Sequence, residues 1–377
     1  MKVVLFNWFT FQFLYLISTT LCAQINIDQL AKDFDTEIPK IMKANHVPGA
    51  FVALIESDQV IYQAYFGYSD LKYKLPITNQ TGFNIGSISK VFAAWGIMRL
   101  VEKGKIGLDS AANKYLNQWQ FPESDYDSNL ITIRSLLSHT AGLSVHGYYG
   151  WKKVKNKPTL LESLSGTPKK YTKVALIAEP QTKYQYSGGG YSVLQQIIEE
   201  VTGDKFEHYM DTAVLSPMGM YNSSFTIDDR ILAQSSKEYN KRGREIQFEH
   251  FTETAAAGLH TTPDDLIKFI KLTFSKLNSG KSDSTVISAS TLNEMLKVVP
   301  ASEKTIPYGL GYRRQHSSNS WWHGGANSGW WAIIGINPQH NFGLIVLTNS
   351  FSGNKVERFA FEAWNKRLIE ITNSQGN

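Results

Sequence analysis

Residues 83–101 read FNIGSISKVFAAWGIMRLV, and between Ser87 and Met98 the only formally charged side chain is that of Lys90. A helix that is apolar on every side is normally buried, and a buried lysine is costly unless its amine is used. Ser87 and Lys90 are three residues apart, so in a helix they share a face and the amine can reach the hydroxyl. The segment therefore predicts a serine nucleophile with its own base at the start of a buried helix.

The Ser-x-x-Lys spacing occurs twice more, at 69–72 and 352–355, in each case within a polar turn or loop. Neither of these copies begins an apolar helix. At Ser87 the positive end of the helix dipole and burial both push a lysine toward its neutral form, which is the form that accepts a proton. Only this copy is predicted to carry chemistry.

Composition indicates a globular protein of one large domain or two intimate ones. The chain has 377 residues, 42% of them hydrophobic, and a formal charge of +5, which argues against a dedicated nucleic-acid binder. Basic clusters at 152–157 and 237–244 are interpreted as solvated faces, or as surfaces that favour anionic substrates or cell-surface polymers. The absence of a His-Glu-x-x-His motif and of a Gly-x-Ser-x-Gly elbow disfavours a zinc hydrolase of that kind and an α/β-hydrolase.

The N-terminus is typical of a secretory signal peptide. Lys2 precedes an apolar run over 3–21, and Cys22 and Ala23 follow. We expect cleavage after Ala23, with an uncleaved anchor as the alternative, so that the mature domain, 24–377, is periplasmic or secreted. Because Cys22 is the only cysteine, the mature chain would have no disulfide, thiolate metal site or cysteine nucleophile.

Hydrophobic periodicity places strands toward both ends of the chain. Apolar and alternating runs predict strands at 49–55, 60–66, 312–314, 321–323, 330–336 and 342–348. Helical stripes and caps predict helices at 27–45, 191–203, 263–274, 288–298 and 357–371. Strands from both ends imply one antiparallel sheet flanked by helices, with a mainly helical region at about 105–261 inserted into it. The expected fold class is mixed α/β.

Two further stretches carry residues suited to proton transfer or substrate binding. Tyr186 lies in YQYSGGG, residues 184–190, where glycines let the backbone approach a ligand. A neighbouring cation such as Lys90 would lower the pKa of this tyrosine and let it relay a proton. His323 precedes two glycines in WWHGGANSGWW, residues 321–331, where it could hold or protonate a substrate. The alternatives are a tyrosine that packs the turn and a structural histidine.

Six motifs stand in order along the chain: SISK at 87–90, LLSHTAGL at 136–143, YSG at 186–188, AGL at 257–259, YGLG at 308–311 and HGG at 323–325. This order resembles the serine β-lactamase-related superfamily, in particular its class C branch of β-lactamases, D-Ala-D-Ala carboxypeptidases, D-aminopeptidases and esterases. The resemblance covers nearly the whole mature chain. It implies a β-lactamase/transpeptidase-like fold.

The resemblance also implies roles for individual residues. Ser87 would be the acylated nucleophile, Lys90 its base or hydrogen-bond partner, and Tyr186 the proton relay in acylation and deacylation. The backbone N–H groups of Ser87 and Ala326 would form the oxyanion hole. His323 stands where the β-lactamases carry a lysine.

Two departures from the family pattern concern the substrate. Gly188 replaces the usual asparagine and removes an amide that in this family helps to hold the substrate. His323 replaces the lysine of Lys-Thr-Gly, and Gly324 and Gly325 after it would clear room for a ligand. Both departures weaken the case for an efficient β-lactamase and leave acyl-enzyme chemistry intact.

We therefore expect an exported serine hydrolase that forms a covalent acyl-enzyme on an ester or amide, without metal or cofactor. A peptidase on D-amino-acid peptides or an esterase is favoured over a β-lactamase. The alternative is a non-catalytic penicillin-binding or interaction protein that kept the fold. The expected partner is a small-molecule or peptide substrate and not a nucleic acid; association with the cell wall and the oligomeric state are left open.

The stretch SVHGYYGW, residues 144–151, has no periodic face and predicts a loop. Aromatic side chains on loops are often binding surfaces, because they bury large areas at modest entropic cost. We predict that Tyr149 or Trp151 lines the substrate pocket. The alternative is that the rings pack under the loop to hold it down.

Overall fold

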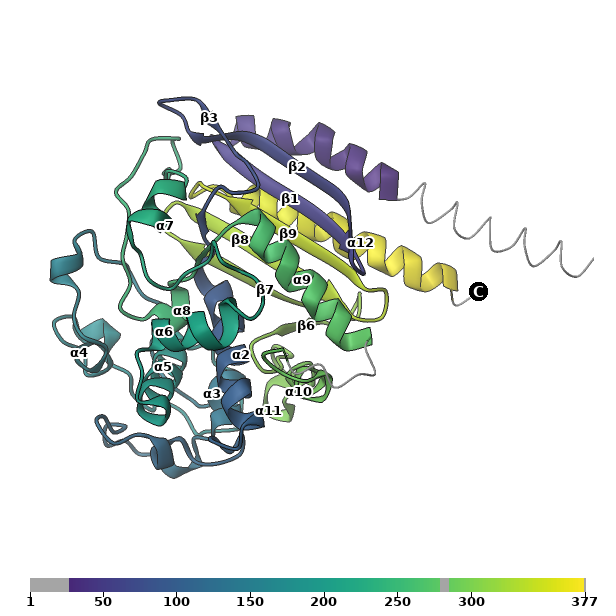
Figure 1. Cartoon of the computed structure of the whole chain (residues 1–377). Helices are drawn as coiled ribbons and strands as arrows, with labels where there is room; N and C mark the ends of the chain where they lie inside the picture. Colours follow the sequence, from purple (N-terminus) through teal and green to yellow (C-terminus); the bar gives the residue numbers. More distant parts are fainter. Residues whose placement is uncertain (1–26, 279–284, 376–377) are drawn as a thin grey trace, which may run out of the picture.

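The computed structural model describes residues 27–278 and 285–375 (Figure 1). The predicted signal peptide, with Cys22 and the expected cleavage after Ala23, lies outside the described residues. Over the described part of the chain, no helix has both the length and the apolar character that a membrane span requires.

A seven-stranded antiparallel sheet lies at the centre of the molecule (Figure 1). Its strand order is β3-β2-β1-β9-β8-β7-β6, so the first strand along the chain pairs with the last. This arrangement confirms the predicted sheet built from both ends of the chain. The strands are β1 Gly49–Glu56, β2 Gln59–Asp70, β3 Leu75–Pro76, β6 Arg313–Gln315, β7 Ser320–Asn327, β8 Trp330–Asn337 and β9 Phe342–Thr348.

Two helices cover the outer face of the sheet. Residues 27–44 form the first, and α12, Asn354–Gln375, lies beside it (Figure 1). Phe34 and Trp364 from these helices join strand side chains such as Val346 in one apolar cluster. Because helices cover the sheet on both faces, β9 is buried along its whole length and reads as a continuous apolar run rather than an alternating one.

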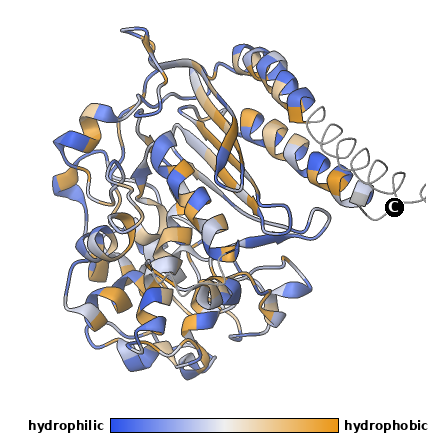
Figure 2. Ribbon diagram, turned by 45° about the vertical axis from the view of Figure 1, so that its right-hand side comes forward, coloured by the Kyte–Doolittle hydropathy of each residue, from blue (hydrophilic) through white to orange (hydrophobic). Residues whose placement is uncertain are grey.

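The inner face carries the larger core, which contains α2, Ser89–Glu102, and α9, Pro263–Asn278. Nearly every residue of α2 is buried, which explains its lack of a polar face. Figure 2 shows hydrophobic segments in the strands of the sheet, whereas the helices that flank it have both hydrophilic and hydrophobic residues.

Between α2 and β5, His260–Thr261, the regular elements are helices joined by long loops, and this region packs below the sheet (Figure 1). Glycines end two of the predicted helices: α5 stops before Gly203, which has φ +72°, and α2 stops before Gly104, which has φ +67°. The shorter elements are β4 Phe83–Asn84, α3 Ile133–Leu137, α4 Leu160–Leu164, α5 Gly188–Thr202, α6 Phe206–Met210, α7 Asp229–Gln234, α8 Thr254–Ala257, β5 His260–Thr261, α10 Ala289–Met295 and α11 Pro300–Glu303.

Candidate active site

Ser87 sits in a single 3₁₀ turn, Gly86–Ile88, between β4 and α2. Gly86 has φ +50°, and a Cβ there would lie 2.5 Å from the backbone nitrogen of Ala326. Only glycine meets both conditions without strain. The Gly86 N–H donates to the Asn84 side-chain oxygen at 2.8 Å, and Asn327 donates to the same oxygen at 2.6 Å. The serine is therefore presented by a turn that is fixed against strand β7.

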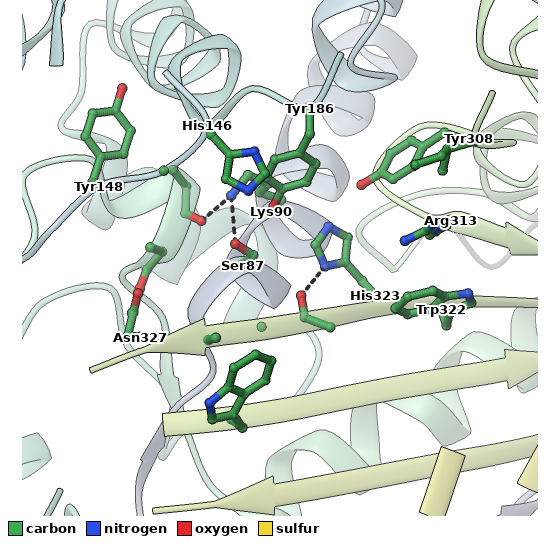
Figure 3. Close-up of a pocket in the computed structure, with 18 of the residues that line it drawn as sticks. Ser87, Lys90, His146, Tyr148, Tyr186, Tyr308, Arg313, Trp322, His323 and Asn327 are labelled. Carbon is green, nitrogen blue, oxygen red and sulfur yellow. Dashed lines mark hydrogen bonds between the residues drawn. The ribbon is translucent and has the colours of Figure 1, made fainter. Parts of the chain in front are cut away.

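Lys90 lies within hydrogen-bond distance of this serine, where the sequence predicted a base. Its Nζ donates to the Ser87 Oγ at 3.1 Å and to the Ala256 carbonyl oxygen at 2.6 Å (Figure 3). The side chain is 1% exposed, and burial lowers the pKa of its amine to about 7. A lysine with that pKa is largely neutral at mildly alkaline pH and can accept the serine proton.

Tyr186 contacts the same pair of residues but in a different manner from the expected one. The Lys90 Nζ lies over the tyrosine ring, 5.1 Å from its centroid. Burial raises the pKa of Tyr186, and a hydrogen bond with Ser87 only partly offsets that rise. Lys90 therefore does not convert this tyrosine into a phenolate, and the geometry supports a protonated phenol that can give a proton away.

His139, from the LLSHTAGL motif, positions Tyr186. The two ring centroids are 4.2 Å apart, and the Ser187 N–H donates to the His139 Nδ1 at 3.1 Å. His139 is buried at φ +59°, a conformation that is uncommon outside glycine. The motif is visible in the sequence, but this contact is not, because it depends on two loops that meet only in the folded chain.

His323 lies on β7 and lines the same cavity. Its Nδ1 is 2.7 Å from the Gly324 carbonyl oxygen, so Nδ1 carries the proton and donates, and Nε2 is an unpartnered acceptor. Burial, with Lys90 nearby, lowers the pKa of His323 to about 3. This imidazole is neutral at working pH, which argues against its use as a charged anchor for a substrate anion.

Arg313, on β6, supplies a fixed positive charge in the cavity, and sequence analysis missed it. Its guanidinium lies over the Trp322 ring, 5.0 Å from the centroid, and has no acidic partner among the described residues. Figure 3 shows Arg313, Tyr308 and Trp322 on one side of Ser87 and Tyr148 on the other. A fixed cation without a partner suits an anionic part of a ligand.

The cavity has a volume of about 560 Å³. The close approach of two backbones in its wall requires a glycine at position 325, because a Cβ on Gly325 would lie 1.9 Å from the Ile85 carbonyl oxygen and 2.9 Å from the Ser87 nitrogen. The backbones of β7 and of the nucleophile turn thus meet beside the serine. Of the residues singled out in the sequence, those that line the cavity are Ser87, Lys90, Tyr186, His323, Gly324, Gly325 and Ala326.

The two aromatic residues predicted to line the pocket do not do so. Tyr149 is 72% exposed, and Trp151 lies under the Lys169 ammonium, 4.0 Å from its ring centroid. The segment is a loop as predicted, but its cavity-facing part is His146, Gly147 and Tyr148. An irregular loop has no period from which the direction of each ring could be deduced.

Gly188 is buried beneath this loop and is absent from the cavity wall. A Cβ at Gly188 would lie 3.1 Å from the His146 carbonyl oxygen and 3.3 Å from the Tyr148 ring. The loop therefore fills the room into which a longer side chain at this position would project. The His146 ring instead faces the cavity, 4.8 Å from that of Tyr186.

A serine hydrogen-bonded to a buried lysine whose pKa is lowered is an arrangement that can support nucleophilic catalysis. The family model described as Beta-lactamase matches residues 34–368. The chain thus belongs to the Beta-lactamase family, whose members are generally serine hydrolases.

Individual relatives agree with this assignment. Protein flp of Staphylococcus aureus strain MW2 is 24% identical over 322 residues, which are 84% of this chain and 63% of that protein. The chain thus spans less than two thirds of the length of this relative. The octameric penicillin-binding protein homologue from Pyrococcus abyssi has a TM-score of 0.72 and 27% identity, over 85% of this chain and 74% of that one. SurE, solved with D-Leu, has a TM-score of 0.70 at 22% identity, over 92% and 76%, and shows similarity of fold alone.

Proposed function

We propose that the protein is an exported serine hydrolase that cleaves an ester or amide through an acyl-enzyme at Ser87, and that its substrate carries a carboxylate. The observation that carries the proposal is the Lys90 amine, buried, with a lowered pKa and 3.1 Å from the serine oxygen. Export rests on the sequence of residues 1–23, which is typical of a signal peptide.

In acylation, the neutral Lys90 amine takes the hydroxyl proton of Ser87 as the serine oxygen attacks the substrate carbonyl carbon. The N–H groups of Ser87 and Ala326 would stabilise the negative charge on the carbonyl oxygen. As the bond to the leaving group breaks, Tyr186 donates its phenolic proton to that group, and the Lys90 ammonium returns a proton to Tyr186. The products are the ester of Ser87 and the protonated leaving group.

In deacylation, water replaces the leaving group and the same residues work in reverse order. Tyr186 passes its phenolic proton to the neutral Lys90 amine as it takes a proton from the attacking water, and the Lys90 ammonium then protonates the departing Ser87 oxygen. The product is a carboxylic acid and free enzyme. Both half-reactions need only one proton to move between three side chains, and no metal or cofactor takes part.

Arg313 supports a carboxylate-bearing substrate, because its charge is fixed and His323 is neutral. Peptides with a free carboxylate are such substrates, and one similar protein bears a name that fits this class, the penicillin-binding protein homologue from Pyrococcus abyssi. A site without a side-chain amide at Gly188 lacks one group used to hold the amide of a β-lactam substrate. A peptidase on D-amino-acid peptides or an esterase is therefore favoured over a β-lactamase.

A covalent probe tests the proposal directly. A fluorophosphonate or fluorescent penicillin should label the wild type and fail to label Ser87→Ala, and the intact mass should rise by one adduct. A screen of esters, D-amino-acid peptides and nitrocefin then ranks the substrates. Equal labelling of both variants would place the nucleophile elsewhere. A folded wild type that neither labels nor turns over any substrate would instead favour the non-catalytic, interaction-protein alternative.

A further inference from the structure

Glu357 is a carboxyl group in the active-site cavity that the proposed mechanism does not use. It lies in the first turn of α12 and forms part of the cavity wall. Its side chain has no hydrogen-bond or ion-pair partner among the described residues, and burial raises its pKa to about 8. Glu357 is half-buried, and a carboxyl partly withdrawn from water without a partner is unfavourable unless a ligand supplies that partner.

Glu357 reaches the cavity beside Gly324, which lies on strand β7 just past the residues that pair with β6. A Cβ at Gly324 would lie 3.3 Å from the Glu357 Oε1 and 3.6 Å from the Trp322 ring. The same Trp322 ring carries the Arg313 guanidinium on it. Alternate residues of a strand face the same side, so Trp322 and Gly324 share the face that Glu357 approaches. The Glu357 carboxyl and the Arg313 guanidinium, neither of which has an ionic partner among the described residues, thus lie near the same indole ring in the cavity.

We propose that Glu357 and Arg313 form a subsite for a zwitterionic amino-acid group of the substrate, with its ammonium at Glu357 and its carboxylate at Arg313. The proposal rests on the proposed function and names the part of the substrate that lies over the Trp322 end of the cavity. A bound ammonium would favour the ionised form of Glu357, and so the partner missing from the protein is supplied by the ligand.

A purely structural role for Glu357 accounts for less. An acidic side chain in the first turn of a helix is stabilised by the helix dipole, but Glu357 also lines the cavity and has no hydrogen-bond or ion-pair partner among the described residues. Stabilisation by the helix dipole would not depend on the residue that faces Glu357. The missing side chain at Gly324, by contrast, leaves space beside the Glu357 carboxyl.

The test uses protection of Ser87 from a fluorophosphonate by small ligands on the full chain. D-alanine carries both charges, N-acetyl-D-alanine only the carboxylate, and ethylamine only the ammonium. In the wild type, the concentration of D-alanine that gives half-maximal protection should be at least about tenfold lower than that of N-acetyl-D-alanine. This ratio is the one expected for one hydrogen bond between charged groups. Protection is expressed relative to the uninhibited labelling rate of the same variant.

Glu357→Gln should abolish the advantage of D-alanine over N-acetyl-D-alanine, and Arg313→Met should weaken protection by both. Glu362→Gln, an exposed position on the same helix, is the matched control and should retain the wild-type ratio. Melting temperatures are measured in parallel.

Three results would overturn the subsite: equal protection by the two ligands in the wild type, an unchanged ratio in Glu357→Gln, or a melting temperature many degrees lower in Glu357→Gln with the ratio retained. Should the wild type not label at all, the proposed function fails on that result alone. Calorimetric titration of D-alanine and N-acetyl-D-alanine into the wild type and Glu357→Gln then decides the subsite independently.

Discussion

Replacing Lys90 by methionine should abolish activity and at the same time stabilise the protein near neutral pH. In the unfolded chain the amine has its ordinary pKa of 10.5, and burial lowers it to about 7 in the folded state. That difference corresponds to about 5 kcal/mol of free energy of unfolding, at about 1.36 kcal/mol per pKa unit. Methionine removes this cost but leaves the Ala256 carbonyl and the Ser87 hydroxyl without a donor, which costs about 1–3 kcal/mol.

The net expectation is a variant more stable by about 2–4 kcal/mol at pH 7. The sign depends on pH. Between about pH 7 and 10.5 the unfolded state binds the proton of Lys90 and the folded state does not, so wild-type stability rises with pH across this window. The advantage of Lys90→Met should shrink through the same window and reverse at its upper end.

Two assays check this reasoning. Urea unfolding of the wild type and Lys90→Met at pH 7 and 9.5 gives the two stability differences, and the fluorophosphonate labelling rate of the wild type gives the chemistry. The labelling rate should rise about tenfold per pH unit below about 7 and level off above it, and the variant should be slower by about 10² to 10⁴. A variant that is less stable at both pH values, or a labelling rate that is flat from pH 5.5 to 8.5, would refute a buried, neutral amine as the base.

Three other predictions concern the same cavity. Tyr186→Phe should depress acylation, and its effect should combine with that of Lys90→Met less than additively, because both residues move one proton; full additivity in the double variant would separate them. Activity on carboxylate-bearing and neutral esters should show the same pH dependence between 5.5 and 7, because His323 stays neutral there, Glu357 keeps its proton and Arg313 stays charged; a selective loss for the carboxylate ester as the pH rises through this window would restore the charged-histidine hypothesis. Gly188→Asn should lower the free energy of unfolding by about 1–3 kcal/mol through overpacking against the 146–148 loop, without a gain in nitrocefin hydrolysis; a stable variant with new β-lactamase activity would contradict the packing argument.

The predicted fold and the nucleophile were accessible because both depend on short-range pattern. The strands at 49–55 and 342–348 are continuous apolar runs, which indicates that each is buried on both faces. Because these runs lie near the two ends of the chain, they also indicate a sheet in which an early strand pairs with a late one. Ser87 and Lys90 are close in sequence, so the geometry of one helical turn is enough to bring them together.

Arg313 and Glu357 could not be found in this way. The first reaches the cavity because β6 pairs with β7 in a register that sets Arg313 opposite Trp322, and the second because α12 packs on the outer face beneath a glycine. Neither the register of two paired strands nor the packing of a helix on a sheet can be deduced from a short window of sequence. The prediction that Tyr149 or Trp151 lines the pocket failed for a related reason: an irregular loop gives no rule for which ring turns inward, and the ring that does so is that of Tyr148.

The charge of the site connects these observations to the chemistry. Lys90, His139 and His323 share one buried region, burial lowers the pKa of each, and Lys90 adds to the lowering at both histidines. None of the three has a carboxylate partner among the described residues, so the resting region is close to uncharged. When Ser87 attacks, the proton that arrives on Lys90 creates a cation at the moment when the carbonyl oxygen becomes an anion. In a cavity poor in water these two charges stabilise each other strongly, so the burial that makes a charged Lys90 unfavourable in the resting enzyme favours it in the transition state.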